Sequence, residues 1–171
     1  MRGPGQPGGP RIAGGLGPRV RRLPTVDDSR DLGRRLGAIV RAGDLVVLTG
    51  PLGAGKTALA QGIGAGMGVQ GRIASPTFVI ARVHPPSVEG GATLVHVDAY
   101  RLGSLDEVDD LDLDVEAQSS VTVVEWGAGM VEQLADARLD VILERADDSD
   151  ERTATLVPHG GDWATRLAAL D

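Results

Sequence analysis

Apolar residues fall into short unbroken blocks at three places along the chain. The blocks at residues 44–50, 93–100 and 120–127 are rich in valine and leucine, and each is long enough for one strand. Continuous rather than alternating apolar runs are typical of strands that are buried on both faces, as in a parallel sheet. We therefore predict three central strands from these blocks.

Two stretches with helical spacing precede and follow the first block. Thr25, followed by Asp27 and Asp28, is a helix start signal, and it predicts a helix over residues 26–43 that ends at Gly43. Residues 56–67, which read "KTALAQGIGAGM", predict a second helix that ends near Gly68. Strand and helix therefore alternate along this part of the chain.

The remaining patterns add outer elements. "RVRRLP" predicts a short first strand, and "SPTFVIARVH" predicts a turn at Pro76 that leads into another strand. Residues 137–146 and 151–160 flank the acidic turn "DDSD" and predict a hairpin, after which a short helix starts at Asp162. The fold class that follows is α/β, a three-layer sandwich with a mostly parallel sheet and antiparallel strands from the C-terminal hairpin.

Composition indicates one folded domain. With 171 residues, 42% of them apolar, and a mean hydropathy of −0.03, the chain has the size and balance of a single water-soluble domain, for which we take residues 20–171. Residues 1–19 hold seven glycines and four prolines without an apolar segment, so we expect a disordered tail rather than a signal peptide.

Charge, cysteine content and hydropathy exclude several classes of protein. The net charge of −7 argues against a protein that holds nucleic acid by itself. No cysteine is present, so the chain has no disulfide or thiolate chemistry, which fits a cytoplasmic location. No apolar run approaches the length of a membrane span, so we expect no membrane association.

The segment "GPLGAGKT" carries the most specific chemical signal. Gly50, Gly55, Lys56 and Thr57 fit the spacing G-x-x-x-x-G-K-T of a P-loop, and they stand between a predicted strand and a predicted helix. In this loop backbone amides surround phosphate oxygens, the lysine reaches the β- and γ-phosphates, and the threonine hydroxyl binds Mg²⁺. Lys56 is the only lysine beside sixteen arginines, as expected where a compact ammonium must approach a crowded phosphate.

A P-loop also needs a carboxylate near the metal, because Mg²⁺ prefers oxygen ligands and usually takes one or two from the protein. Asp98 ends the apolar run "LVHVD" and Glu125 ends "VTVVE", so either residue is a candidate. Strand alternation places His96 on the same face as Asp98, and we expect the two to position a water or a phosphate together.

Four segments together resemble the TsaE (YjeE) family. "GPLGAGKTAL", "SPTF" from Ser75, "HVDAYRL" from His96 and "VEWG" from Val124 occur in the order and at the intervals of that family. Its members are small P-loop ATPases that act with the proteins TsaB and TsaD to form threonylcarbamoyladenosine in the tRNA anticodon loop. The similarity runs from about Leu23 to the C-terminus. The N-terminal extension has no counterpart in the family core.

The resemblance implies a role for each matching residue. Asp98 would be the catalytic carboxylate, and Thr77 would sense the γ-phosphate. Thr57 and Glu125 would bind Mg²⁺, Trp126 would lie close to the nucleotide, and the turn near Val26 would approach the adenine. The ATP phosphates would be held by Leu52, Gly53, Ala54, Gly55, Lys56 and Thr57. tRNA would be contacted only indirectly, through the complex with TsaB and TsaD.

Three other functions are alternatives for a P-loop chain of this size. A small-metabolite kinase of the shikimate kinase type has a similar size, but "SPTF" and "VEWG" are not its pattern. A GTPase would need an Asn-Lys-x-Asp motif, and the chain has no asparagine. A nucleotide-dependent assembly subunit, in which hydrolysis only resets a complex, is compatible with the ATPase interpretation and stays open.

Overall fold

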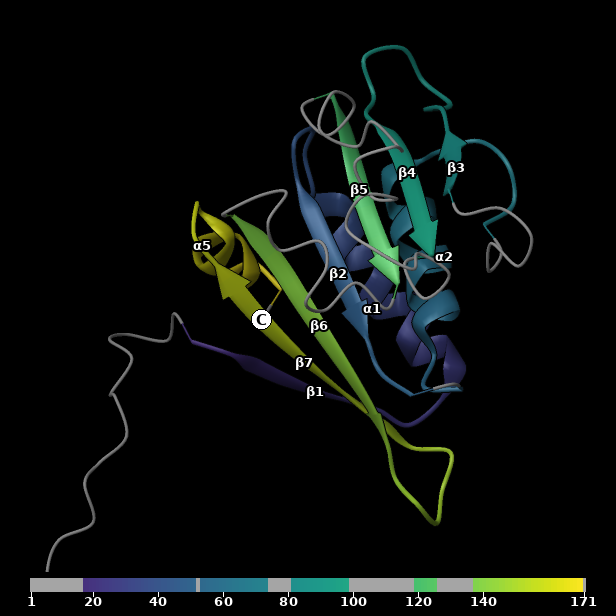
Figure 1. Ribbon diagram of the computed structural model, residues 1–171, viewed down its shortest axis with the longest axis vertical. Helices are drawn as coiled ribbons and strands as arrows, with labels where there is room; N and C mark the ends of the chain where they lie inside the picture. The colour runs from purple at the N-terminus through teal and green to yellow at the C-terminus, as the bar shows by residue number, and fades with distance from the viewer. Residues whose placement is uncertain (1–16, 52, 74–80, 99–118, 126–136, 171) are drawn as a thin grey trace, which may run out of the picture.

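The computed structural model describes residues 17–51, 53–73, 81–98, 119–125 and 137–170 (Figure 1). These residues form a seven-stranded sheet with the strand order β1-β7-β6-β2-β5-β4-β3. The strands are β1 (Arg19–Leu23), β2 (Leu45–Thr49), β3 (Ala81–His84), β4 (Thr93–Asp98), β5 (Ser120–Glu125), β6 (Arg138–Arg145) and β7 (Arg152–His159). The described helices are α1 (Val26–Ile39), α2 (Lys56–Met67) and α5 (Trp163–Ala168).

The sheet has a parallel centre and antiparallel edges. β2 pairs in parallel with β5 and β6, and β4 pairs in parallel with β5. β3 joins β4, β7 joins β6 and β1 joins β7 in antiparallel register. The predicted α/β architecture and the C-terminal hairpin are confirmed, with one refinement: the first hairpin strand, β6, belongs to the parallel centre, and only β7 runs against it.

The central strands are buried on both faces, as their continuous apolar runs predict. α1 and α2 lie side by side against one face, behind the sheet in Figure 1. On that face Leu48, Val123 and Leu139 share one core cluster with Leu36 of α1 and Leu59 of α2. The alternate side chains, which point to the opposite face, are also buried: Leu45, Val47, Val95, Val97 and Val124.

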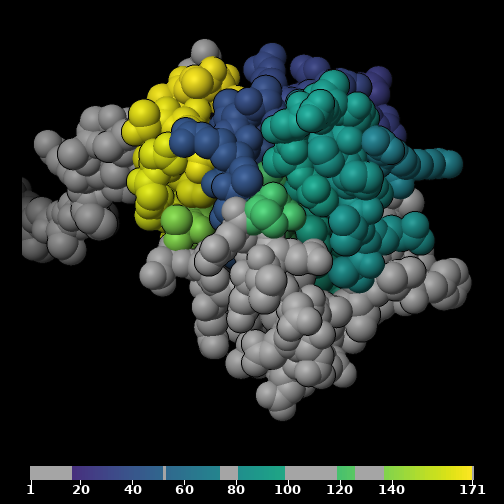
Figure 2. Space-filling view, turned by 90° about the horizontal axis from the view of Figure 1, so that it is seen from above, coloured from purple at the N-terminus to yellow at the C-terminus, as the bar shows by residue number. Residues whose placement is uncertain are grey.

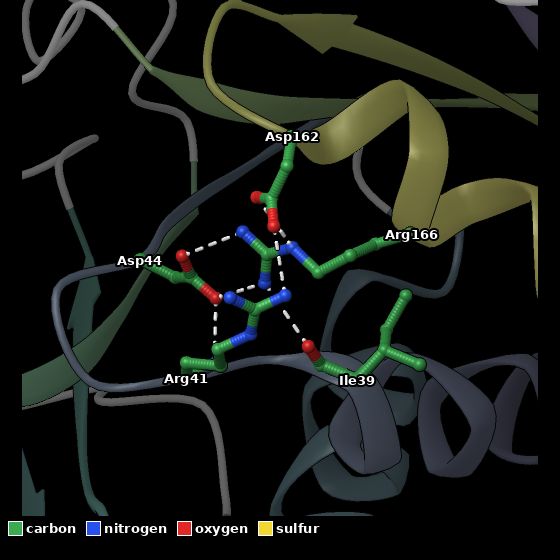
Figure 3. Close-up of polar contacts among 5 residues, drawn as sticks. All are labelled: Ile39, Arg41, Asp44, Asp162 and Arg166. Carbon is green, nitrogen blue, oxygen red and sulfur yellow. Dashed lines mark hydrogen bonds and ion pairs between the residues drawn. The ribbon is translucent and has the colours of Figure 1, made fainter.

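A network of polar contacts connects α5 to Asp44 in the turn that leads into β2 (Figure 3). Arg166 donates from Nη1 and Nη2 to the two carboxylate oxygens of Asp44, at 2.6 and 2.9 Å, and from Nε to Asp162 at 2.9 Å. Its guanidinium also lies 3.9 Å from the ring centroid of the buried Trp163. The hydrogen bonds to Asp44 raise the pKa of Arg166 above its ordinary value.

This network lies at the end of the sheet where the parallel strands begin. Figure 2 views the molecule from that end and shows the yellow C-terminal segment against the blue segment that enters β2. Backbone hydrogen bonds from Gly43 to Ser120 and from Thr122 to Asp44 tie the same turn to β5. The carboxyl ends of the parallel strands, where ligands bind in such sheets, lie at the opposite end of the sheet.

Two predicted boundaries shift in the structure. α1 ends at Ile39, because Val40 is already extended, whereas Gly43 (φ 95°) lies in the turn into β2. β1 begins at Arg19, as "RVRRLP" predicts, so the predicted tail ends before this residue; residues 1–16 of the tail lie outside the described part. The predicted helix end near Gly68 is confirmed, since Gly68 caps α2 with φ 72°. None of the described helices is long and apolar enough to cross a membrane.

Candidate nucleotide site

The P-loop connects the carboxyl end of β2 to the first residue of α2. Gly53 and Gly55 have φ values of 81° and 100°, in the left-handed region that favours glycine. Gly50 is required for a different reason, because a Cβ there would lie 2.6 Å from the backbone oxygen of Leu143. The glycine positions of the motif are therefore set by backbone geometry and by close packing against β6.

The N-terminus of α2 is open, in contrast to that of α1. α1 begins with a capping box, in which the Thr25 side chain accepts from the Asp28 amide and the Asp28 carboxylate accepts from the Thr25 amide. α2 begins after Gly55, and no side-chain hydrogen bond caps its first turn. Helix N-termini carry unpaired amides and a partial positive charge, so this end is suited to bind an anion such as phosphate.

Lys56 occupies the mouth of the loop. Its side chain is buried, and Nζ donates to the carbonyl oxygens of Gly50 at 2.6 Å and Pro51 at 3.0 Å. Desolvation lowers the pKa of Lys56, although the charges of Glu125 and Asp98 act in the opposite direction. Two converging carbonyls within the loop suit a compact ammonium better than a broad guanidinium, which explains the lysine at this position.

The two predicted carboxylates meet beside Lys56. Asp98 is the last residue of β4 and Glu125 the last residue of β5, and the two are register partners in the parallel pair. Glu125 is also the register partner of Leu48 in β2, the strand that leads into the P-loop. Both carboxylates are buried, with exposed fractions of 8% and 3%. The structure therefore brings together Lys56, Asp98 and Glu125, as the sequence predicted.

His96 contacts the carboxylate that ends the neighbouring strand. It lies on the same face of β4 as Asp98, but its Nε2 is 2.7 Å from Oε2 of Glu125 on the neighbouring strand. The imidazole is completely buried. The predicted shared face of His96 and Asp98 is confirmed, and their joint positioning of a water or a phosphate stays a prediction. The contact between His96 and Glu125 is an addition to it. The sequence did not show this contact because it depends on β4 lying beside β5.

An arginine from the C-terminal hairpin also contacts the loop. Arg152 of β7 donates from Nε and Nη2 to the carbonyl oxygen of Gly53, at 3.3 and 3.1 Å. Arg82 and Arg101 are two further arginines that could bring a positive charge to the site. Arg82 lies on the edge strand β3, and Arg101 lies outside the described residues. Arg152 was missed because 99 residues separate it from Gly53.

The other predicted site residues divide into described and undescribed ones. Thr57 lies in the first turn of α2 and is partly exposed. Val26 is the first residue of α1 and is 40% exposed; the same end of α1 approaches the loop, since Ser29 Oγ lies 3.7 Å from where a Cβ of Gly55 would stand. Ala54, within the loop, is buried. The predicted residues Leu52, Thr77 and Trp126 lie outside the described residues.

The described residues fit Mg-nucleotide chemistry. They contain no group of three or more histidine, aspartate or glutamate side chains able to hold a metal by themselves. A Mg²⁺ ion bound with a nucleotide needs no such cage, because it usually takes one or two protein ligands and completes its shell with phosphate oxygens and water. The site offers hydrogen-bond donors for phosphate, namely the open helix N-terminus and the buried lysine. It also offers two buried carboxylates as oxygen ligands for the metal.

Comparisons with known proteins agree with this geometry. Residues 23–154 match the family model described as threonylcarbamoyl adenosine biosynthesis protein TsaE. A curated protein of Streptomyces coelicolor, named tRNA threonylcarbamoyladenosine biosynthesis protein TsaE, is 59% identical over 140 residues, which cover 80% of this chain and 94% of that protein. A protein of the same name from Bacillus subtilis is 36% identical over 78% of this chain and 82% of its own length.

A solved structure shows the same fold. The crystal structure of Bacillus subtilis YdiB is similar with a TM-score of 0.70 and 28% sequence identity, over 90% of this chain and 93% of that one. The similarity therefore extends over nearly the whole of both chains.

Proposed function

Because the chain belongs to the TsaE family, we propose that it is an ATP-binding and ATP-hydrolysing subunit that acts in tRNA threonylcarbamoyladenosine biosynthesis. We further propose that it works in the cytoplasm with TsaB and TsaD, and that it reaches tRNA only through that complex. The proposed pathway rests on membership of the family. The ATPase role rests on the site geometry, and the two partners rest on the resemblance of the motifs.

The observation that carries the ATPase role is the position of Lys56. The ammonium lies at the mouth of a glycine loop and is within the electrostatic influence of Glu125 and Asp98. Phosphoryl transfer needs charge neutralisation and an oriented nucleophile more than covalent catalysis. The loop amides and Lys56 supply the first requirement, and a buried carboxylate at a strand end is suited to the second.

In this proposal each described residue has a separate task. Thr57 and Glu125 would hold Mg²⁺, which would supply positive charge that neutralises the phosphate oxygens. Asp98 accepts a hydrogen bond from the attacking water and so orients it. Lys56 and the amides of the first turn of α2 bind the phosphates, and the N-terminal end of α1 near Val26 borders the nucleotide.

A tRNA modification assay tests the pathway role. Purified TsaB and TsaD, with tRNA, ATP and the precursors of the modification, are assayed with and without this protein, and threonylcarbamoyladenosine is measured by mass spectrometry of digested tRNA. We expect the modified nucleoside only in the complete mixture, or far more of it there. Equal amounts with and without the protein would contradict the proposed role.

The same assay separates an ATPase that drives the modification from an assembly subunit. Asp98→Ala should retain ATP binding and lose hydrolysis, since Asp98 is placed as the water-orienting carboxylate. If this variant supports modification for many turnovers, nucleotide binding is sufficient and hydrolysis does not drive the reaction. If it supports at most one turnover per complex, hydrolysis is needed in every cycle.

A further inference from the structure

His96 is a completely buried polar residue in the middle of a central strand. Its neighbours along the same face of β4 are Leu94 and Asp98, and its register partner on β5 is Val123. A buried imidazole among valines and leucines costs free energy unless its polar atoms are paired. An aliphatic residue would suit the core at this position, so the histidine calls for a reason other than packing.

Among the described residues, the imidazole is hydrogen-bonded to the carboxylate at the end of the neighbouring strand. Nε2 of His96 lies 2.7 Å from Oε2 of Glu125, which is a short hydrogen bond. A carboxylate oxygen only accepts, so Nε2 carries the proton and donates it. Nδ1 has no hydrogen-bond partner among the described residues. A neutral ring protonated on Nε2 leaves only a lone pair unpaired, whereas a charged ring would leave a buried N–H donor unpaired.

We propose that His96 is a positioning residue for the metal ligand Glu125. Its Nε2–H holds Oε2, fixes the carboxylate rotamer at the end of β5 and leaves the other carboxylate oxygen for Mg²⁺. The inference rests on the proposed function, because Glu125 is a metal ligand only if the site binds Mg-nucleotide. Hydrogen-bonded partners of metal ligands contribute about 10- to 100-fold to metal affinity in other proteins.

Three variants of His96 separate positioning from packing. His96→Gln retains an N–H donor at about the position of Nε2, His96→Asn places its amide at about the position of Nδ1 and does not reach Glu125, and His96→Leu fills the volume without a donor. For each folded variant, calorimetry gives the affinity for ADP in excess Mg²⁺ and in EDTA. The ratio of the two affinities is the gain due to Mg²⁺.

For His96→Leu and His96→Asn we expect the ratio of the two affinities to fall about tenfold or more. The affinity in EDTA should be unchanged. We expect His96→Gln to retain most of the gain. The inference is overturned if His96→Leu keeps the wild-type ratio, or if His96→Gln is as impaired as His96→Leu. A wild-type protein that binds no ADP, or binds it without any gain from Mg²⁺, would overturn the proposed function and the inference with it.

A second measurement tests the contact without nucleotide. The chain has three histidines, so the ¹⁵N imidazole signals of the wild-type protein can be assigned with His96→Gln. We expect His96 to be the Nε2–H tautomer, with an Nε2 proton protected from exchange, and we expect Glu125→Ala to remove that protection. An Nδ1–H tautomer, or a signal that Glu125→Ala leaves unchanged, would show that the hydrogen bond does not exist, whatever the outcome for ATP.

Discussion

Gly33 of α1 and Gly62 of α2 are in direct backbone contact. A Cβ on Gly33 would lie 2.8 Å from the Cα of Gly62, and a Cβ on Gly62 would lie 2.2 Å from the carbonyl oxygen of Arg30. One turn further along, Gly37 and Gly66 repeat the arrangement, again with 2.8 Å between the added Cβ and the opposite Cα. Because α2 starts at Lys56, this glycine contact fixes the P-loop relative to the N-terminal end of α1.

Gly62→Ala is therefore expected to destabilise the protein by about 3 kcal/mol, because the new methyl group meets backbone that cannot rotate away. Helix propensity alone predicts the opposite sign, since alanine in place of glycine stabilises a helix interior by about 1 kcal/mol. Urea denaturation measures the change. Ala65→Gly, at an exposed position of α2, is the control, with an expected loss of about 1 kcal/mol from propensity alone. A Gly62→Ala protein as stable as the wild type would refute the tight contact.

Lys56→Ala should abolish measurable ATP binding. The loop amides alone cannot offset the repulsion among the phosphates once the ammonium is removed. Lys56→Arg should also bind poorly, because the planar guanidinium does not fit between the carbonyls of Gly50 and Pro51, to which Nζ now donates. Isothermal calorimetry gives the affinities, and circular dichroism verifies that each variant is folded. An ATP affinity in Lys56→Ala equal to that of the wild type would exclude this site as the nucleotide site.

The two carboxylates should differ in phenotype. Glu125→Ala should weaken the dependence of nucleotide binding on Mg²⁺, because it removes the proposed metal ligand. Asp98→Ala should leave ATP binding intact and reduce hydrolysis by a factor of about 100 or more, as expected for loss of a group that orients the nucleophile. A Mg²⁺ titration of ADP binding and single-turnover hydrolysis distinguish the two. If the phenotypes were exchanged, the roles of Asp98 and Glu125 would be exchanged with them.

The contact between Arg166 and Asp44 should be important for stability. Both side chains are largely buried, with exposed fractions of 10% and 12%. Arg166→Met keeps much of the apolar stem but leaves Asp44 without its main partner, and we expect a loss of about 2 kcal/mol in the free energy of unfolding. Arg34→Met is the matched control, because Arg34 pairs with Asp31 on an exposed surface, where ion pairs contribute about 0.5 kcal/mol. Equal losses in the two variants would mean that burial of the Arg166 pair has no energetic consequence.

Local patterns in the sequence were sufficient for much of the site. The P-loop spacing and the acids that end two apolar runs identified Lys56, Asp98 and Glu125, because each signal lies within a few residues of its strand or helix. The neighbouring strands then brought these side chains together by parallel register.

The contacts that were missed depend on strand order. The order β2-β5-β4 places Glu125 beside His96, and the order β7-β6-β2 brings Arg152 to Gly53. Neither order can be read from hydrophobic spacing in a single sequence. The end of α1 was misplaced because Gly43 is a plausible helix terminator, yet its left-handed backbone is used in the turn before β2. The glycine contact between the two helices did have a local signal, the four-residue spacing of glycines in each helix.

We propose that ATP hydrolysis depends on partners because the isolated site lacks a group that fast hydrolysis needs. P-loop enzymes often need an arginine or an ordered switch segment from a partner, which can raise turnover about a thousandfold or more. Arg152 is a described arginine that contacts the loop, but its guanidinium donates to the Gly53 carbonyl. We therefore expect the isolated chain to hydrolyse ATP slowly and TsaB with TsaD to accelerate it.

Steady-state phosphate release at fixed salt and Mg²⁺ tests this central claim most directly. Three samples are compared: the chain alone, the chain with TsaB and TsaD, and Lys56→Ala with TsaB and TsaD. We predict slow release in the first sample, a large increase in the second and background release in the third. Turnover by the isolated chain at about ten per second, the rate of a typical enzyme, that the partners leave unchanged would contradict partner activation. Full activity of Lys56→Ala in the complex would contradict the assignment of the site itself.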